Sequence, residues 1–173
     1  YIPVDVERLS IDVSALKAKL RSRPADLIYF DIGCAMFPVP LKDVREAAGP
    51  DVTIVYDASH TLGLIAGGAF QSPLTEGSDI VQGNTHKTFP GPQKAMVALK
   101  DSSLATKMKD SLSFGLVSSQ HTHHTMALCV AILEMETFGK AYAAQTIANA
   151  KALANALSEC GILLLEREGI ATE

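Results

Sequence analysis

Apolar segments of strand length alternate with segments of helical periodicity along this 173-residue chain, and the alternation limits the fold more than any other feature. The run VTIVYD at 52–57 is apolar and β-branched, which is typical of a strand buried on both faces. Similar runs predict three more strands, at 26–32, 79–84 and 95–100. Strands that alternate with helices indicate βαβ units. We therefore predict an α/β fold, a three-layer sandwich whose mainly parallel sheet is covered by helices.

Helical segments separate and follow these strands: 11–20, 40–48, 60–68, 124–138 and 141–160. Pro24 ends the first of them, and Pro40 opens the second near its first turn. The third is a short helix or a turn. The last two are long, alanine-rich and amphipathic, and Gly161 stands where a cap of the final helix is expected. The apolar run ILLL at 162–165 then predicts a return to strand.

Charge and cysteine content narrow the classes of function. The net charge of −4 argues against a nucleic-acid surface, which is usually basic. No apolar run approaches the roughly 20 residues of a membrane helix, and no segment has the layout of a signal peptide. Cys34, Cys129 and Cys160 lie far apart, without metal-ligand or disulfide spacing. We expect a cytoplasmic protein with reduced thiols and with neither nucleic-acid nor membrane partners.

Polar residues come at the ends of three predicted strands. Asp57 ends VTIVYD, residues 84–87 (NTHK) come at the end of DIVQGN, and Cys34 follows DLIYFDI. Ligands of open α/β sheets bind outside the carboxyl ends of the strands. Since parallel strands end at the same edge of the sheet, these residues are expected to lie near one another. The sequence therefore predicts a binding site at this edge.

Asp57 and Lys87 are the residues whose chemistry points to a particular ligand. An unpaired carboxylate at the end of an apolar strand is costly, so Asp57 either caps the following helix or binds a cation. Lys87 follows His86 in a segment poor in acids, and is either a solvated loop residue or a nucleophile. Pyridoxal phosphate uses both residue types, an aspartate for its pyridine nitrogen and a lysine as Schiff-base anchor. Two successive strand ends are suited to hold opposite ends of that flat cofactor.

Two motifs surround this pair of residues. The first contains Asp57, His60, Gly63, Leu64, Ala66 and Gly68. The second contains Thr85, His86, Lys87, Thr88, Gly91 and Pro92. In this order and at this distance, the two motifs make the segment 56–101 resemble the serine hydroxymethyltransferase family, which consists of pyridoxal-phosphate enzymes of the aspartate-aminotransferase fold type.

The resemblance implies a place for this chain within a larger enzyme. Residues 1–160 would form part of the pyridoxal-phosphate-binding large domain of a fold-type-I enzyme, and residues 161–173 would start its C-terminal small domain. Nothing in the sequence resembles the family's N-terminal phosphate-binding turn or its carboxylate-binding arginine. We therefore expect the chain to be a piece of a longer polypeptide.

The resemblance also implies roles for the matching residues. Lys87 would form the Schiff base with the cofactor, and Asp57 would pair with the pyridine nitrogen and keep it protonated. His60 would lie near the phenolic oxygen of the cofactor and the carboxylate of the substrate. Thr85 and His86 would line the approach of the lysine and help to position it.

The chain departs from the family at other positions. Residues 93–95 are QKA, where the family has an arginine followed by two glycines. Ser119 and Gln120 stand where family glycines reach the cofactor phosphate of the neighbouring subunit, and we retain both as phosphate ligands. Cys34 falls where the family often has a serine near the substrate carboxylate, so it is either a substrate contact or a buried bystander thiol.

Three histidines, His121, His123 and His124, raise the question of a metal site. Their spacing does not place three imidazole rings on one face of a helix, and no acidic or cysteine ligand is near them in sequence. The sequence favours a solvated or interfacial helix start instead. We predict no metal site.

The resemblance implies pyridoxal-phosphate-dependent aldol or retro-aldol cleavage and transfer at the Cα–Cβ bond of β-hydroxy amino acids, with serine, threonine or glycine as substrate. The acceptor would be tetrahydrofolate, as in the hydroxymethyltransferases, or another aldehyde that takes the glycine carbanion, as in threonine transaldolases. An aminotransferase or decarboxylase of the same fold and a non-catalytic fragment remain as alternatives. In all these relatives the site lies between two subunits, so a homodimer with shared active sites is expected.

Overall fold

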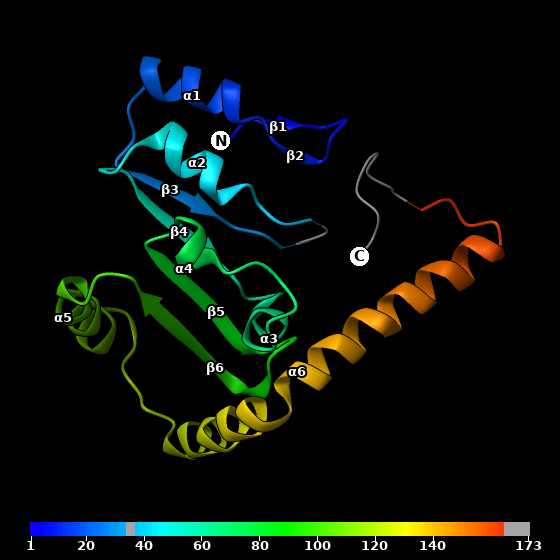
Figure 1. The fold of residues 1–173 in the computed structure, drawn as a ribbon. Helices are drawn as coiled ribbons and strands as arrows, with labels where there is room; N and C mark the ends of the chain where they lie inside the picture. Colours follow the sequence, from blue (N-terminus) through cyan, green and yellow to red (C-terminus); the bar gives the residue numbers. More distant parts are fainter. Residues whose placement is uncertain (34–36, 165–173) are drawn as a thin grey trace.

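The computed structural model describes residues 1–33 and 37–164 and contains a four-stranded sheet of order β3-β4-β5-β6 (Figure 1). Its strands are β3 (Leu27–Phe30), β4 (Thr53–Asp57), β5 (Ile80–His86) and β6 (Pro90–Leu99). The first three run parallel, which confirms the predicted mainly parallel sheet. β6 runs antiparallel to β5, because residues 87–89 alone join the two strands and are too few for a crossover.

A small hairpin lies near the N-terminus. β1 (Val4–Asp5) pairs antiparallel with β2 (Ser10–Ile11), and Leu9, in the turn between them, has a φ of 48°. This hairpin was not predicted from the sequence, because strands of two residues leave no periodic pattern.

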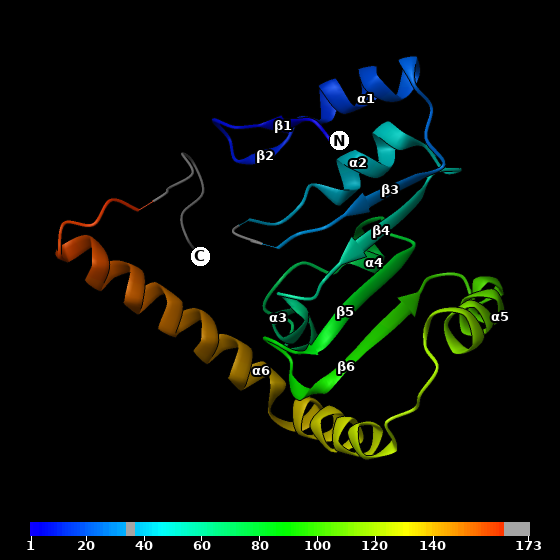
Figure 2. The ribbon, with the colours of Figure 1, turned by 180° about the vertical axis from the view of Figure 1, so that it is seen from behind.

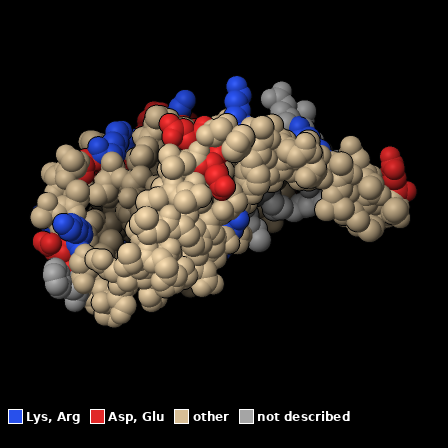
Figure 3. Space-filling model, turned by 90° about the horizontal axis from the view of Figure 1, so that it is seen from below, with Lys and Arg blue, Asp and Glu red and all other residues tan. Residues whose placement is uncertain are grey.

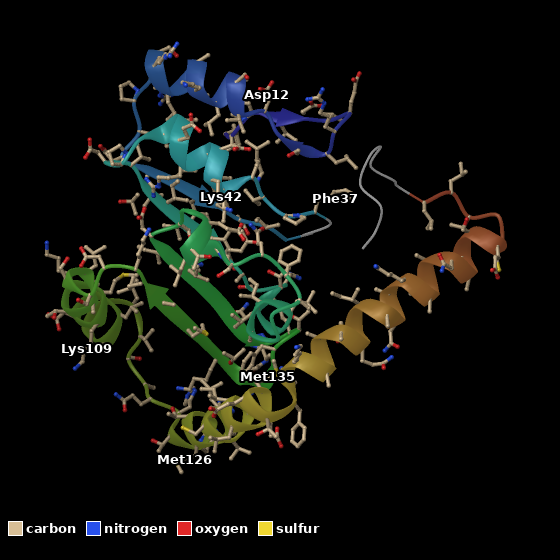
Figure 4. The ribbon with its side chains drawn as sticks, viewed as in Figure 1. Asp12, Phe37, Lys42, Lys109, Met126 and Met135 are labelled. Atoms are coloured by element: carbon tan, nitrogen blue, oxygen red, sulfur yellow. The ribbon has the colours of Figure 1, made fainter. Side chains whose placement is uncertain are left out.

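Four short helices precede or connect the strands: α1 (Val13–Ser22), α2 (Leu41–Ala48), α3 (Leu62–Ala66) and α4 (Pro73–Glu76). Asp12 caps the N-terminus of α1 (Figure 4), where its Oδ1 accepts a hydrogen bond of 2.8 Å from the backbone N–H of Ala15. This helix ends before Pro24, as predicted. The single-turn α4 was not predicted, because four residues are too few to show helical periodicity.

The rest of the described chain is mainly helical, with α5 (Ser103–Asp110), the π-helix η1 (Ser111–Leu116) and α6 (Thr122–Glu159). The two long helices predicted from the sequence are one continuous helix of 38 residues, so the predicted break between them is wrong. Gly139 lies inside this helix, against the end of α3. A Cβ on Gly67 would be 2.4 Å from the carbonyl oxygen of Gly139, so the two helices touch through their backbones.

Gly161 ends α6 as predicted. Its φ is 79°, and its backbone N–H donates to the carbonyl oxygen of Ser158 at 2.9 Å. The backbone N–H of Ile162 donates to the carbonyl oxygen of Leu157 at 3.1 Å, which completes a Schellman cap. Residues 162–164 do not form the predicted strand, and the remainder of that run lies outside the described residues.

The hydrophobic core lies between one face of the sheet and the helices. Its buried cluster draws on both: Leu16, Ile28, Phe30, Leu41, Val44, Ile54, Tyr56, Ala58, Leu62, Val81, Phe89, Ala131 and Met135. Residues 54–56 of β4 are all buried, so this strand is covered on both faces, as predicted. Because side chains alternate along a strand, Tyr29 points to the opposite face from Phe30, and it is 40% exposed.

Helix α6 contacts the rest of the molecule only in part (Figures 1 and 2). Its buried residues all lie near its middle: Ala131, Met135, Gly139 and Ala143. Met135 is 8% exposed and lies between α6 and the sheet, whereas Met126, near the start of the helix, is 64% exposed (Figure 4).

Charged side chains are sparse on the face of the molecule shown in Figure 3. Among the described residues, no helix is long and apolar enough to span a membrane.

Candidate functional site

Asp57 is the last residue of β4, at the carboxyl edge of the sheet. Its Oδ1 accepts a hydrogen bond of 2.8 Å from the backbone N–H of Ser59. Its Oδ2 accepts two side-chain hydrogen bonds, from the hydroxyl of Tyr29 at 3.1 Å and from Nε2 of Gln82 at 3.2 Å. Thr61, and not Asp57, stands at the N-cap position of α3. The carboxylate therefore stabilises the turn after β4. It does not cap the following helix, which was one of the two roles considered for Asp57 from the sequence.

These hydrogen bonds determine the charge of Asp57. Partial burial by itself raises the pKa of the carboxyl group, but the hydrogen bonds from Ser59, Gln82 and Tyr29 outweigh burial, and the pKa is lower than usual. Burial, followed by the negative charge of Asp57, raises the pKa of the Tyr29 hydroxyl. At neutral pH, Asp57 is thus an ionised acceptor and Tyr29 a neutral donor.

Lys87 is the first residue after β5, and its exposed side chain reaches the turn that follows β4. Its Nζ lies 3.2 Å from Nε2 of His60, which comes from that turn. The two ion pairs found in the described part of the chain, Arg8–Asp5 and Arg45–Asp79, do not include it. Among the described residues, the partner of this amine is therefore an imidazole and not a carboxylate.

Thr88 fixes the loop that carries Lys87. Its hydroxyl donates to the carbonyl oxygen of His60 at 2.7 Å and accepts from the backbone N–H of Gly63 at 3.1 Å. Its carbonyl oxygen accepts a hydrogen bond of 2.8 Å from the hydroxyl of Tyr142, on α6. A Cβ on Gly63 would lie 2.1 Å from that same carbonyl oxygen, so only glycine permits this approach. The loop at residues 87–89, called the lysine loop below, is therefore held by α3, by α6 and by the turn that follows β4.

Thr85 and His86 are the last two residues of β5 and directly precede Lys87. Thr85 is buried, and its hydroxyl donates to the carbonyl oxygen of Pro92 at 2.7 Å, which closes the β5–β6 hairpin. His86 is exposed and pairs with Pro90 in the register of the two strands. Both residues therefore support the hairpin from which Lys87 projects, and a direct contact with a cofactor stays a prediction for each.

Ser119 and Gln120 lie in the exposed loop before α6. No hydrogen bond within the described residues joins either of them to Asp57, His60 or Lys87. Their predicted role as phosphate ligands of a neighbouring subunit therefore stays a prediction. Cys34 lies outside the described residues.

The three histidines at the start of α6 form a compact group. The ring centroids of His123 and His124 are 4.3 Å apart, and those of His121 and His124 are 5.6 Å apart. Partial burial, followed by the charges of His123, His121 and Lys94, lowers the pKa of His124. The lowered pKa favours the neutral form of the His124 imidazole.

Two residues of the site, Tyr29 and Gln82, were not predicted from the sequence. The register pairs Gln82 with Asp57 and sets Tyr29 beside Val55, two residues before Asp57. Since alternate residues of a strand share a face, all three polar side chains lie on the same face of the sheet. The alternation was visible in the sequence, but the relative register of three strands was not.

The donor set fits pyridoxal phosphate. An ionised carboxylate is available at the end of β4 for a protonated ring nitrogen, and an amine paired with imidazole follows β5. Across the described ranges, no three His, Cys, Asp or Glu side chains are grouped so as to hold a metal ion.

Comparisons with known proteins agree with this chemistry. The family model described as Serine hydroxymethyltransferase matches residues 3–169. Fluorothreonine transaldolase of Streptantibioticus cattleyicolor is 46% identical over 162 residues, which are 94% of this chain and 25% of that protein. Serine hydroxymethyltransferase of Methanothermobacter marburgensis is 45% identical over 164 residues, which are 94% of this chain and 38% of that protein.

A solved structure shows the same fold. It is the L-threonine transaldolase of Pseudomonas fluorescens in its internal aldimine state, and it superposes with a TM-score of 0.88 at 40% sequence identity. The match covers 92% of this chain and 37% of that one. The chain thus spans a quarter to two fifths of the relatives named here. The likeness confirms the predicted α/β fold with its mainly parallel sheet.

Proposed function

Because the chain belongs to the serine hydroxymethyltransferase family, we propose that it is the cofactor-anchoring part of a pyridoxal-phosphate-dependent enzyme. The proposed reaction is aldol or retro-aldol cleavage and transfer at the Cα–Cβ bond of β-hydroxy amino acids such as serine and threonine. The full-length relatives are a hydroxymethyltransferase and two transaldolases, which supports this class of reaction. When bound, pyridoxal phosphate supplies a ring that withdraws electrons from a bond at the α-carbon of an amino acid.

Two residues would hold the cofactor. Asp57 would pair with the protonated pyridine nitrogen, which its ionised carboxylate favours. Lys87 would bind the aldehyde group of the cofactor through its Nζ. The observation that carries the proposal is that these two groups lie at the ends of adjacent parallel strands, at one edge of the sheet. One is a carboxylate held ionised by its donors, and the other is an amine whose partner among the described residues is an imidazole.

His60 would move protons at this edge. Its Nε2 lies 3.2 Å from Nζ of Lys87, which is within the distance for direct proton transfer. The hydroxyl of Thr88 holds the backbone of His60 through its carbonyl oxygen. The imidazole would therefore accept a proton from the amine and return it, without a change in backbone position.

Transaldolation is the second candidate within this class, and the residues after Lys87 favour it. Residues 93–95 are QKA, where the resemblance places an arginine and two glycines. This exchange would alter contacts to tetrahydrofolate while the residues around Asp57 and Lys87 stay as in the family. An aldehyde other than formaldehyde would then be the acceptor, and tetrahydrofolate would not be needed.

We also propose a cytoplasmic homodimer with shared active sites. The exposed apolar side chains of α6 support a partner surface on this helix: Met126, Val130, Leu133, Phe138 and Leu153. Ser119 and Gln120 have no hydrogen bond to Lys87 within the described residues, and we propose that they serve the site of the second subunit. The partners in the reaction would be a small amino acid and an aldehyde or folate.

The test of the class uses the full-length protein and added pyridoxal phosphate. We expect the wild type to take up the cofactor with a visible absorbance band, and Lys87→Ala to lose that band. Lys100→Ala is the matched control, because Lys100 is exposed at the far end of β6 and should leave the band intact. A wild type that stays colourless after dialysis against pyridoxal phosphate would contradict the proposal.

A second assay separates the two reactions. Threonine supplied with a foreign aldehyde should give a new β-hydroxy amino acid and acetaldehyde if the enzyme is a transaldolase. Serine supplied with tetrahydrofolate should give glycine and methylenetetrahydrofolate if it is a hydroxymethyltransferase. Turnover in neither assay, by a protein that binds the cofactor, would favour an aminotransferase or a decarboxylase of the same fold.

A further inference from the structure

The carboxylate of Asp57 belongs to a closed triangle of side chains from three neighbouring strands. The hydroxyl of Tyr29 donates to Oδ2 of Asp57 at 3.1 Å, and Nε2 of Gln82 donates to the same oxygen at 3.2 Å. Nε2 of Gln82 also donates to the hydroxyl oxygen of Tyr29 at 2.6 Å. β3, β4 and β5 therefore each contribute one member of the triangle.

The direction of every proton in this triangle follows from its chemistry. An ionised carboxylate only accepts hydrogen bonds, so the group of Gln82 that faces it must be the amide nitrogen and not the amide oxygen. The two N–H groups of that nitrogen supply one hydrogen bond to Asp57 and one to Tyr29. Since the Tyr29 oxygen accepts from Gln82, its own proton is left for Asp57. The triangle therefore suits the ionised carboxylate and not the protonated acid.

We propose that Tyr29 and Gln82 are positioning residues, which fix the orientation of the Asp57 carboxylate for pairing with the pyridine nitrogen of the cofactor. The inference rests on the proposed function. Without the two side chains, Ser59 would be the one remaining hydrogen-bond donor of the set, so the carboxylate would be less restricted in its rotation. The lowered pKa of Asp57, to which Gln82 and Tyr29 both contribute, is consistent with this role.

The chain offers a matched comparison in a second tyrosine–glutamine pair. Tyr56, on β4, points to the opposite face of the sheet from Asp57, and its hydroxyl donates to Oε1 of Gln71 at 3.1 Å. This pair has no hydrogen bond to Asp57 among the described residues. Tyr56→Phe thus removes a tyrosine hydroxyl from the strand that carries Asp57 and leaves the triangle unchanged.

The experiment compares two cofactors on the full-length protein. Dissociation constants are measured for pyridoxal 5′-phosphate and for 1-deazapyridoxal 5′-phosphate, in which a C–H group replaces the pyridine nitrogen. The variants are Tyr29→Phe, Gln82→Leu and the control Tyr56→Phe. Because Tyr29 and Gln82 lie on separate strands, each variant tests the triangle independently if the other fails to fold. The pKa of Asp57 is followed in the cofactor-free protein by carboxyl ¹³C NMR, with Asp57→Asn for assignment.

We expect Tyr29→Phe and Gln82→Leu each to weaken the binding of pyridoxal phosphate about tenfold, which is the size of one hydrogen bond to a charged group. The affinity for the deaza cofactor should not change, because it has no ring nitrogen for Asp57 to pair with. The pKa of Asp57 should rise in both variants and stay unchanged in Tyr56→Phe.

Two results would overturn the positioning role. One is an equal loss of affinity for both cofactors, which would indicate general damage to the site. The other is an unchanged pKa of Asp57 in both variants. A wild type that binds neither cofactor would instead contradict the proposed function, and the pKa of Asp57 in the cofactor-free protein would then decide alone whether Tyr29 and Gln82 control the carboxylate.

Discussion

The side-chain amine of Lys87 lies 3.2 Å from Nε2 of His60, although the two residues belong to segments that follow different strands. This contact joins the two motifs of the sequence in one place. It depends on Thr88, whose hydroxyl bridges the carbonyl oxygen of His60 and the backbone N–H of Gly63. Thr88 therefore joins its own loop, which carries Lys87, to the turn that carries His60.

His60→Ala tests the proton-transfer role of the imidazole. We expect turnover to fall by about 10²- to 10⁴-fold, the usual range for loss of a general acid–base group, while the visible band of the bound cofactor remains. Steady-state kinetics and absorbance spectra measure the two effects separately. His123→Ala is the control, since that exposed imidazole lies at the start of α6. Unchanged turnover in His60→Ala would rule out the proposed role.

Gly63→Ala tests the contact between α3 and the lysine loop. The added Cβ would lie 2.1 Å from the carbonyl oxygen of Thr88, so either the loop or the helix must move. We expect a loss of about 1–3 kcal/mol in the free energy of unfolding, measured in urea, together with weaker cofactor binding. Gly115→Ala is the control, because a Cβ there meets open space. Equal stability of the two variants would show that the loop adapts at no cost.

The lowered pKa of Asp57 predicts how stability depends on pH. A carboxyl group whose folded-state pKa lies below its ordinary value of 3.8 stabilises the fold fully above that value, and the contribution is lost as the pH falls through the folded-state pKa. We expect the difference in unfolding free energy between the wild type and Asp57→Asn to shrink as the pH is lowered from 6 to below ~3.8. Urea unfolding across this range measures it. A constant difference would mean that the charge of Asp57 does not stabilise the fold.

Mixed dimers test the proposed role of Ser119. Lys87→Ala removes the amine from one subunit, and Ser119→Asp places a negative charge where the phosphate of the other subunit's cofactor would bind. If sites are shared, refolding the two inactive variants together restores one site in each heterodimer, or roughly one quarter of wild-type activity. Mixing that restores no activity would indicate that each site is contained within one chain.

The sequence predicted those parts of the structure that depend on local pattern. The strand at Asp57, the helix cap at Gly161 and the end of α1 before Pro24 follow from apolar periodicity and from the backbone preferences of glycine and proline. Lys87 and His60 were found because they lie in motifs next to strand ends.

What the sequence did not reveal depends on contacts between distant segments. Tyr142 reaches the carbonyl oxygen of Thr88 from 54 residues away, and Tyr29 and Gln82 reach Asp57 through strand register. The continuity of α6 through Gly139 was missed for a related reason. Glycine disfavours a helix locally, but here it allows close packing against the end of α3, and the packing outweighs that preference.

The hydrogen bond from Tyr142 to Thr88 has a consequence for the order in which the site is assembled. During synthesis, β4, β5 and the loops that follow them leave the ribosome before α6 has been made. Asp57 and Lys87 therefore emerge first. The lysine loop gains its last hydrogen bond only when the middle of α6 docks. The loop that carries Lys87 is therefore complete only once this helix has docked, and not when the sheet has formed.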